Sequence, residues 1–346
     1  MTRMKTTVDS APENDLDQSA WLAPSPNPSL RPAKERMREE RDGARFPGGR
    51  GALNPVGAVG DKSRLAVFAE LVKARLTLLV LLTTLVGLYL GVQGRVDYVL
   101  MLHAMLGTAL VASGAAALNQ FLEREWDARM RRTEERPLPS GRIQPGTALI
   151  FGGVSSAAGL VYLTSVVNPL TGLLGAITLA SYLFIYTPLK RVTTLNTVIG
   201  AVPGALPPLM GWTAARGEIS VEGWSLFAIL FFWQLPHFLS IAWIYREDYA
   251  RAGFAMLPVF DPTGERTGRH AVSYTLGLLP VSLCPFLFGL AGPVYLGGAV
   301  LLGAVFAGCA VRFSLELTNQ RARQLFYLSI IYLPLLLGLM VLDKVR

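Results

Sequence analysis

Uncharged, mostly apolar segments recur along most of this 346-residue chain. Each is close to the roughly 20 residues that an α-helix needs to cross the hydrocarbon core of a bilayer. A single such segment could be the core helix of a soluble protein, but their repetition favours an all-α polytopic membrane protein. The sequence therefore predicts nine transmembrane helices, over residues 76–94, 98–121, 147–167, 170–187, 195–214, 224–245, 271–290, 294–311 and 325–342.

The basic residues between these segments predict an orientation. The loops after the second, fourth, sixth and eighth helices carry 15 Lys and Arg, whereas the opposite side carries four. Cytoplasmic loops of membrane proteins have an excess of Lys and Arg. We therefore expect a multi-pass membrane protein with the N-terminus and the basic loops in the cytoplasm and the C-terminus on the other side. Asp9, Glu13, Asp15 and Asp17 argue against a mitochondrial transit peptide, so the expected location is the bacterial cell (inner) membrane.

The N-terminal part differs from the rest of the chain. Residues 1–65 are rich in Pro, Gly, Ser and charge and have few apolar clusters, which predicts a disordered, basic cytoplasmic tail. Residues 66–346 form the predicted nine-helix transmembrane domain. Arginines between residues 31 and 50 could contact anionic lipid headgroups, although a solvated tail is the simpler interpretation.

The densest charge lies between the second and third predicted helices. Residues 119–142 hold eleven charged side chains, whereas residues 143–189 hold none. Asn119, Glu123 and Asp127 are spaced four apart, so on a helix each lies about 40° from the one before and all three share a face. Two carboxylates and an amide oxygen on one face suit Mg²⁺. A network of Glu–Arg pairs is the alternative that this spacing leaves open.

Cations accompany these oxygen ligands. Arg132, Arg136 and Arg142 offer planar donors that suit phosphate oxygens. Metal ligands beside anion-binding side chains suggest a substrate that carries a diphosphate. Tyr186, Lys190 and Arg191 end the fourth predicted helix, although any cytoplasmic loop can carry such cations. Glu247, Asp248 and Arg251 place acid and base together after the sixth helix.

Three stretches of the sequence resemble a known superfamily. Residues 119–138 resemble the first signature of the UbiA-type intramembrane prenyltransferases, in the pattern N-x3-E-x3-D-x2-M-x-R-T-x2-R-P-L. Residues 233–238 (WQLPHF) and 248–258 (DYARAGFAMLP) narrow the resemblance to its haem O synthases, the protoheme IX farnesyltransferases. The resemblance covers roughly residues 71–346.

The resemblance implies a UbiA-like fold of nine helices around a central cavity, with Mg²⁺ bound between side chains and a prenyl diphosphate. Glu123 stands where most members of the superfamily have Asp, and Tyr245 and Tyr249 replace a second Asp pair. Asp248 lies between those tyrosines, as a candidate catalytic residue or as a partner of Arg251, so one or two metal ions are possible. The resemblance assigns Asn119, Glu123 and Asp127 to the metal and to catalysis, and Arg132, Arg136, Tyr186, Lys190 and Arg191 to the diphosphate.

His237 is a further catalytic candidate. It follows Pro236 inside the sixth predicted helix, where an ionisable imidazole is costly unless it has a partner. It could ligate haem iron, act as a base, or make a hydrogen bond within the bundle. Its spacing alone favours the structural role, whereas the resemblance favours a functional one.

The resemblance implies transfer of a farnesyl group from farnesyl diphosphate to a vinyl group of haem B, followed by hydration to the hydroxyethylfarnesyl product. Haem B is then a substrate, and Mg²⁺ is the cofactor. The alternatives are another prenyltransferase of the same fold, acting on a quinone precursor, and a non-enzymatic haem transporter. Haem A synthase or cytochrome oxidase assembly factors are conceivable partners of the tail, and no nucleic-acid partner is expected.

Overall fold

A computed structural model describes residues 62–345. In this part of the chain, nine helices are long and apolar enough to cross a membrane, which confirms the predicted all-α polytopic fold. The predicted tail lies outside the described residues, except for its last four positions. The long helices are α3 (Ala74–Gly91), α4 (Tyr98–Asp127), α5 (Pro145–Tyr162), α6 (Pro169–Ala180), α8 (Asn196–Arg216), α9 (Val221–Ile244), α11 (Glu265–Leu287), α12 (Pro293–Glu316) and α13 (Asn319–Leu342).

Short helices complete two of the membrane spans and cover one end of the bundle. Two π-helices, η3 (Leu163–Val167) and η4 (Ser181–Tyr186), continue α5 and α6, and α7 (Thr187–Leu189) follows η4. The remaining short helices are α2 (Arg64–Leu71), α10 (Arg246–Ala252) and the 3₁₀ helix η5 (Leu257–Val259). Pro at the first helical position begins α5, α6 and α12, where its missing N–H costs no hydrogen bond.

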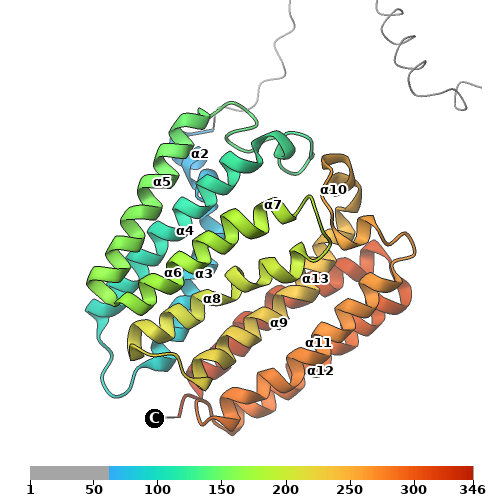
Figure 1. The fold of residues 1–346 in the computed structure, drawn as a ribbon. Helices are drawn as coiled ribbons and strands as arrows, with labels where there is room; N and C mark the ends of the chain where they lie inside the picture. The colour runs from blue at the N-terminus through green and yellow to red at the C-terminus, as the bar shows by residue number, and fades with distance from the viewer. Residues whose placement is uncertain (1–61, 346) are drawn as a thin grey trace, which may run out of the picture. The chain divides into compact units, whose positions relative to one another are not determined.

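The long helices lie roughly side by side. Figure 1 shows α5 at one edge of this bundle and α12 at the other, with α8 and α9 between them. The largest group of buried apolar side chains joins α9, α11, α12 and α13 and extends to α3 and α8. Many apolar side chains on the outside remain exposed, as expected for helices that face lipid.

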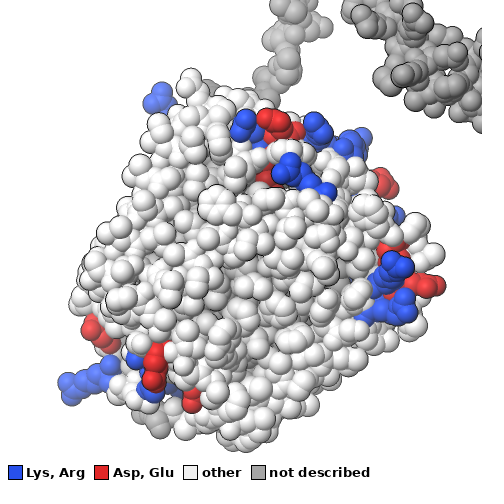
Figure 2. All heavy atoms as spheres, in the orientation of Figure 1, with Lys and Arg blue, Asp and Glu red and all other residues white. Residues whose placement is uncertain are grey.

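Charged side chains are concentrated at the ends of the bundle. Figure 2 shows Lys, Arg, Asp and Glu at opposite ends of the visible face, with a broad uncharged band between them. At one of these ends the helices extend beyond the predicted apolar segments: α4 continues to Asp127, and α11 and α13 begin at Glu265 and Asn319. This end is the polar end of the bundle. The predicted face of Asn119, Glu123 and Asp127 therefore lies within the single helix α4.

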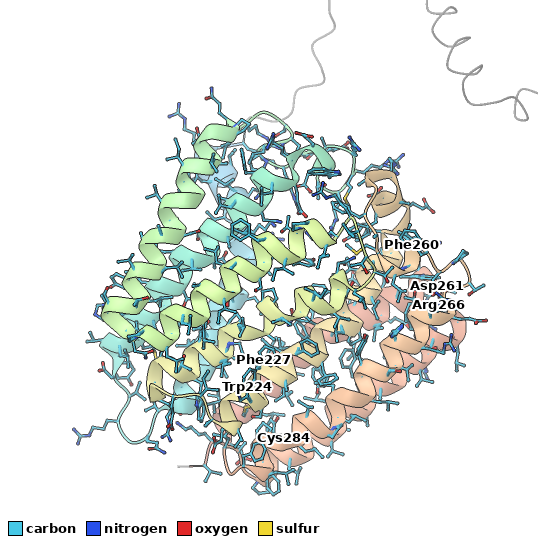
Figure 3. The ribbon with its side chains drawn as sticks, viewed as in Figure 1. Trp224, Phe227, Phe260, Asp261, Arg266 and Cys284 are labelled. Atoms are coloured by element: carbon cyan, nitrogen blue, oxygen red, sulfur yellow. The ribbon has the colours of Figure 1, made fainter. Side chains whose placement is uncertain are left out.

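Two loops of this polar end are held together by hydrogen bonds. The N–H of Ala255 donates to the carbonyl of Lys190 over 2.6 Å, and the Asn196 amide donates to the carbonyl of Ala255 over 2.7 Å. Figure 3 labels Phe260, Asp261 and Arg266 near the start of α11. The buried Asp261 carboxylate accepts hydrogen bonds from the N–H (2.7 Å) and the hydroxyl (2.9 Å) of Thr267. These contacts fix the chain between α10 and α11 against the bundle.

Candidate active site

One large cavity enters the bundle from the polar end. Its volume is about 390 Å³, and α3, α4, η4, α8 and α9 supply most of its lining. Its sides are mainly apolar, whereas its polar end carries acids, an amide and several cations. The sequence-predicted site residues that line it are Asn119, Glu123, Asp127, Arg132, Arg136, Tyr186, Lys190 and His237.

The three predicted metal ligands share one buried face of α4. Asn119 is fully buried, and Glu123 and Asp127 are 4% and 3% exposed. The Asn119 amide donates to Glu123 Oε2 over 3.0 Å and to the hydroxyl of Thr187 over 3.2 Å. Both of these contacts use the Asn119 nitrogen, so its Oδ1 is left to accept from another donor.

Each of the three predicted metal ligands accepts a hydrogen bond from a cationic side chain. Lys190 Nζ lies 2.8 Å and 3.0 Å from the two carboxylate oxygens of Glu123. Arg136 Nη1 donates to Asp127 Oδ2 over 2.7 Å. The hydroxyl of Thr133 donates to the Asp127 carbonyl over 2.8 Å, so the chain after α4 turns back and places Arg136 over the negative end of the helix dipole. Buried carboxylates without such partners would be costly.

The third cation, Lys73, was not predicted from the sequence. Its Nζ donates to Asn119 Oδ1 over 2.7 Å. Lys73 precedes α3 in a left-handed conformation (φ 48°, ψ 53°), which turns the chain from α2 into α3 and directs the side chain into the cavity. The only sequence signal was a pair of cations, Lys73 and Arg75, just before the first predicted apolar segment.

The two lysines have opposite electrostatic environments. Burial, together with the nearby charges of Arg136 and Lys190, lowers the pKa of Lys73 to about 7. Burial alone would also lower the pKa of Lys190, but the adjacent Glu123 carboxylate raises it above its usual range. Lys190 therefore stays charged near neutral pH, and Lys73 is the lysine that loses its proton more readily.

The donor set suits Mg²⁺ that arrives with a phosphate ligand. No group of three His, Cys, Asp or Glu side chains in residues 62–345 is arranged to hold a metal ion by itself. Two carboxylates and an amide oxygen on one buried helix face leave positions for water and for substrate phosphate oxygens, as Mg²⁺ prefers. These residues therefore fit a metal bound jointly by protein and diphosphate.

Arg132 and Tyr186 complete the polar lining. Arg132 donates to the hydroxyl of Tyr249 over 3.1 Å, and its guanidinium lies 5.1 Å from the ring centre of Tyr245. Lys190 Nζ lies 4.6 Å from the ring centre of Tyr186. A Cβ at Gly200 of α8 would collide with the Tyr186 ring, so glycine at this position lets η4 and α8 approach.

Two predicted site residues are not brought into the cavity lining. The guanidinium of Arg191 lies over the ring of Trp126 at 4.0 Å. The Asp248 carboxylate pairs with Arg251 at 3.1 Å, which is the structural partner that the sequence left open for it. Tyr245 and Tyr249, which replace the second Asp pair, contribute rings beside Arg132 instead of carboxylates.

His237 lies deeper in the cavity than the acids do. It is seven residues before the end of α9, or about 10 Å along the helix axis. Its ring stacks on Trp233 at 5.2 Å and on Phe326 at 5.1 Å. Its Nδ1 lies 2.7 Å from the Ser329 hydroxyl oxygen.

The contacts of Ser329 favour one tautomer of His237. Ser329 Oγ lies 2.6 Å from the Phe326 carbonyl oxygen, and when its proton is donated there the oxygen accepts from Nδ1–H. A neutral imidazole with Nδ1–H has its lone pair on Nε2. That nitrogen can therefore bind a metal or accept a proton. The Trp233 indole donates to the carbonyl of the same serine over 2.8 Å, which adds a second link between α9 and α13.

The chain matches the UbiA prenyltransferase family over residues 80–332, more than half of its length. It belongs to this family. A protoheme IX farnesyltransferase of Solibacter usitatus is 52% identical over 286 residues, which cover 80% of this chain and 98% of the relative. A protein of the same name from Koribacter versatilis is 45% identical, over 82% of this chain and 95% of that one. The resemblance found in the sequence motifs is thus confirmed.

Solved structures of UbiA-type enzymes share the fold. A digeranylgeranylglyceryl phosphate synthase aligns with a TM-score of 0.69 at 17% identity, over 81% of this chain and 98% of the other. A UbiA homolog from Archaeoglobus fulgidus, bound to GPP and Mg²⁺, aligns with a TM-score of 0.57 at 15% identity, over 79% and 99% of the chains. At these identities the likeness concerns the fold alone.

Proposed function

We propose that this UbiA family member transfers the farnesyl group of farnesyl diphosphate to a vinyl group of haem B and forms haem O. The observation that carries the proposal is a long apolar cavity whose polar end joins Mg²⁺-type ligands to several cations. The names of relatives up to 52% identical support the farnesyl and haem specificity. The binding of GPP and Mg²⁺ by a protein of the same fold supports the metal and diphosphate assignment.

The polar end binds the diphosphate by an exchange of partners. Asn119, Glu123 and Asp127 would hold Mg²⁺, which supplies positive charge for the departing diphosphate. The cations now on those oxygens become free to donate to phosphate oxygens. Lys73 belongs with the diphosphate-binding residues that the sequence identified, because its Nζ occupies Asn119 Oδ1 just as Lys190 occupies Glu123.

The prenyl transfer itself needs no protein nucleophile. The C1–O bond of farnesyl diphosphate breaks and its electron pair leaves with the diphosphate, which the cations stabilise. The vinyl π electrons of haem form the new C–C bond to the allylic cation at C1. The positive charge then lies on the carbon beside the porphyrin, where water adds and loses a proton. The product carries a hydroxyethylfarnesyl group.

We assign His237 to the haem side of this reaction. It lines the cavity some two helical turns below the end of α9, away from the acids at the polar end. Its Nε2 lone pair can ligate haem iron or accept the proton of the adding water. Both roles require the Nδ1–H tautomer, in which Nδ1–H donates to Ser329, while the stacked rings of Trp233 and Phe326 hold the imidazole in place.

We further infer the position of this protein in the cell. The excess of Lys and Arg beside the polar end favours cytoplasmic placement of the site and the N-terminus, in the inner membrane of a bacterium. The C-terminus then lies on the other side. Residues 66–346 would form the catalytic domain, and residues 1–65 a tail that is open to contact with haem A synthase or oxidase assembly factors.

The deciding experiment supplies purified full-length protein with haem B, farnesyl diphosphate and Mg²⁺, followed by mass spectrometry of the extracted haem. We expect a mass increase equal to one farnesyl group plus one hydroxyl group. The same assay after chelation of divalent ions should give no product. A parallel reaction with an aromatic quinone precursor tests the other prenyltransferase activity. Product from that precursor alone would overturn the haem specificity.

A further inference from the structure

The cavity reaches far along α4 and then ends. Its lining on α4 runs from Asp127 to Thr108, and on the facing helices it stops at Thr83 of α3 and Met210 of α8. From Asn119, the deepest proposed metal ligand, to Thr108 is eleven residues of unbroken helix, or about 16 Å. The corresponding path on α8, from Gly200 to Met210, is about 15 Å.

Tight packing closes the cavity at this depth. Beyond Thr83 and Thr108, the buried side chains of Leu88, Ala104 and Ala214 pack together. The backbones of α3 and α8 are in direct contact at the same level, because a Cβ at Gly87 would collide with the carbonyl of Pro208. The layer beneath Thr83 and Thr108 is therefore closed by backbone contact and tightly packed side chains, which yield little to a longer ligand.

Thr108 is unusual among the floor residues. It is only 3% exposed, and its hydroxyl has no hydrogen-bond partner among the described residues. By contrast, the hydroxyl of Thr83 donates to the Val80 carbonyl over 2.9 Å. Valine would fill the same volume without the hydroxyl, so the volume of this side chain can be tested apart from its polarity.

The depth matches one isoprenoid length. An extended chain advances about 1.2 Å per bond, so the 11 main-chain bonds of farnesyl span about 13 Å. Geranylgeranyl, with 15 bonds, spans about 18 Å, and geranyl, with 7, about 8 Å. With its diphosphate at the metal ligands, farnesyl reaches the floor, geranylgeranyl exceeds the depth available, and geranyl leaves the lower part of the cavity empty.

We propose that Thr108, together with Thr83, forms a floor that limits the isoprenoid chain to the length of farnesyl. Thr108 and Thr83 are then specificity-determining residues rather than catalytic ones. The inference rests on the proposed prenyl transfer, because it assigns the tail of that substrate to the deep part of the same cavity.

The test offers geranyl, farnesyl and geranylgeranyl diphosphates in competition, with haem B and Mg²⁺, and measures the products by mass. We expect Thr108→Phe to lower farnesyl transfer relative to geranyl transfer by about tenfold or more. The double variant Thr83→Ala with Thr108→Ala should raise geranylgeranyl transfer relative to farnesyl by a similar factor. Thr108→Val, which keeps the volume of the side chain, should retain the wild-type preference.

A matched control is Leu106→Phe, because Leu106 lies on α4 two residues away and is 47% exposed on the outer face. Unchanged length preferences in both Thr108→Phe and the double variant would overturn the proposal. An altered preference in Thr108→Val would also overturn it, since volume would not be the cause. If Thr108→Phe does not fold, the double variant decides. Absence of any prenylated haem from the wild-type protein would instead refute the proposed function.

Discussion

At the scale of single residues, the direction of each side chain decides which cations can serve the site. Lys190 and Arg191 are adjacent in the chain, yet Lys190 lines the cavity and Arg191 lies over Trp126. Successive side chains on a helical turn point about 100° apart, so only one of two neighbours faces a given partner. In the loop after α4, Arg132 and Arg136 line the cavity, whereas the other arginines of that loop do not.

The first prediction compares Arg136, which lines the cavity, with Arg191, which does not. Arg136→Ala should weaken the binding of farnesyl diphosphate with Mg²⁺ by about 10- to 100-fold, because one charge-assisted hydrogen bond is worth roughly 1.5–3 kcal/mol. Arg191→Ala removes a similar cation outside the cavity lining and should bind with wild-type affinity. Isothermal titration calorimetry of both variants measures this difference. Equal weakening in the two variants, or loss of haem binding in Arg136→Ala, would point to a collapsed loop instead.

The second prediction concerns His237 and its positioning residue. His237→Ala should stop haem O formation and leave farnesyl diphosphate affinity unchanged, because the imidazole lies deeper than the diphosphate ligands. Ser329→Ala removes the acceptor of Nδ1–H and should lower turnover while the haem still binds. The absorption spectrum of bound haem separates the two roles of His237: a changed axial-ligand signature supports ligation, and an unchanged one supports proton transfer. Normal haem O output from His237→Ala would return the residue to a structural role.

At the scale of helices, the sequence predicted more of the fold than of the contacts between its parts. Long apolar segments have one stable arrangement in lipid, so all nine spans and the shared face of Asn119, Glu123 and Asp127 followed from composition and period. Lys73 could not be predicted in the same way. Its role depends on a left-handed turn before α3 and on a partner 46 residues away.

The π-helices and the contacts between particular helices also could not be predicted from the sequence pattern. The π-helix η4, which ends at Tyr186, shifts the hydrogen-bond register just before Lys190, and an apolar run carries no signal for that change. The approach of α3 to α8 depends on glycine at Gly87 and Gly211, where an added Cβ would collide with backbone atoms of the other helix. Because glycine is common in membrane helices, its presence alone does not identify which pair of helices meets.

At the scale of the whole molecule, the two ends of the bundle have different structures. The polar end holds the metal-ligand face of α4 and the opening of the cavity. At the other end, Lys344 donates to the carbonyls of Tyr89 and Val92 over 2.7 Å each and caps the end of α3. Asp343 accepts from the N–H of Tyr295 at the start of α12 over 2.7 Å. The C-terminal residues therefore join the first and last long helices far from the site.

The third prediction tests which end of the bundle faces the cytoplasm. It uses two glycines that have similar backbone conformations and similarly open surroundings. Gly94 and Gly141 lie in exposed loops at opposite ends of the bundle, both with positive φ and with open space around them. In a chain with Cys284 and Cys309 replaced by alanine, Gly94→Cys should react with a membrane-impermeant maleimide in intact spheroplasts. Gly141→Cys should react only after the membrane is permeabilised, because it lies in the arginine-rich loop that the basic-residue distribution assigns to the cytoplasm. Both substitutions carry the same backbone strain, so a difference in labelling reports sidedness rather than local unfolding. Labelling of Gly141→Cys alone in intact spheroplasts would reverse the orientation and place the opening of the cavity outside the cytoplasm.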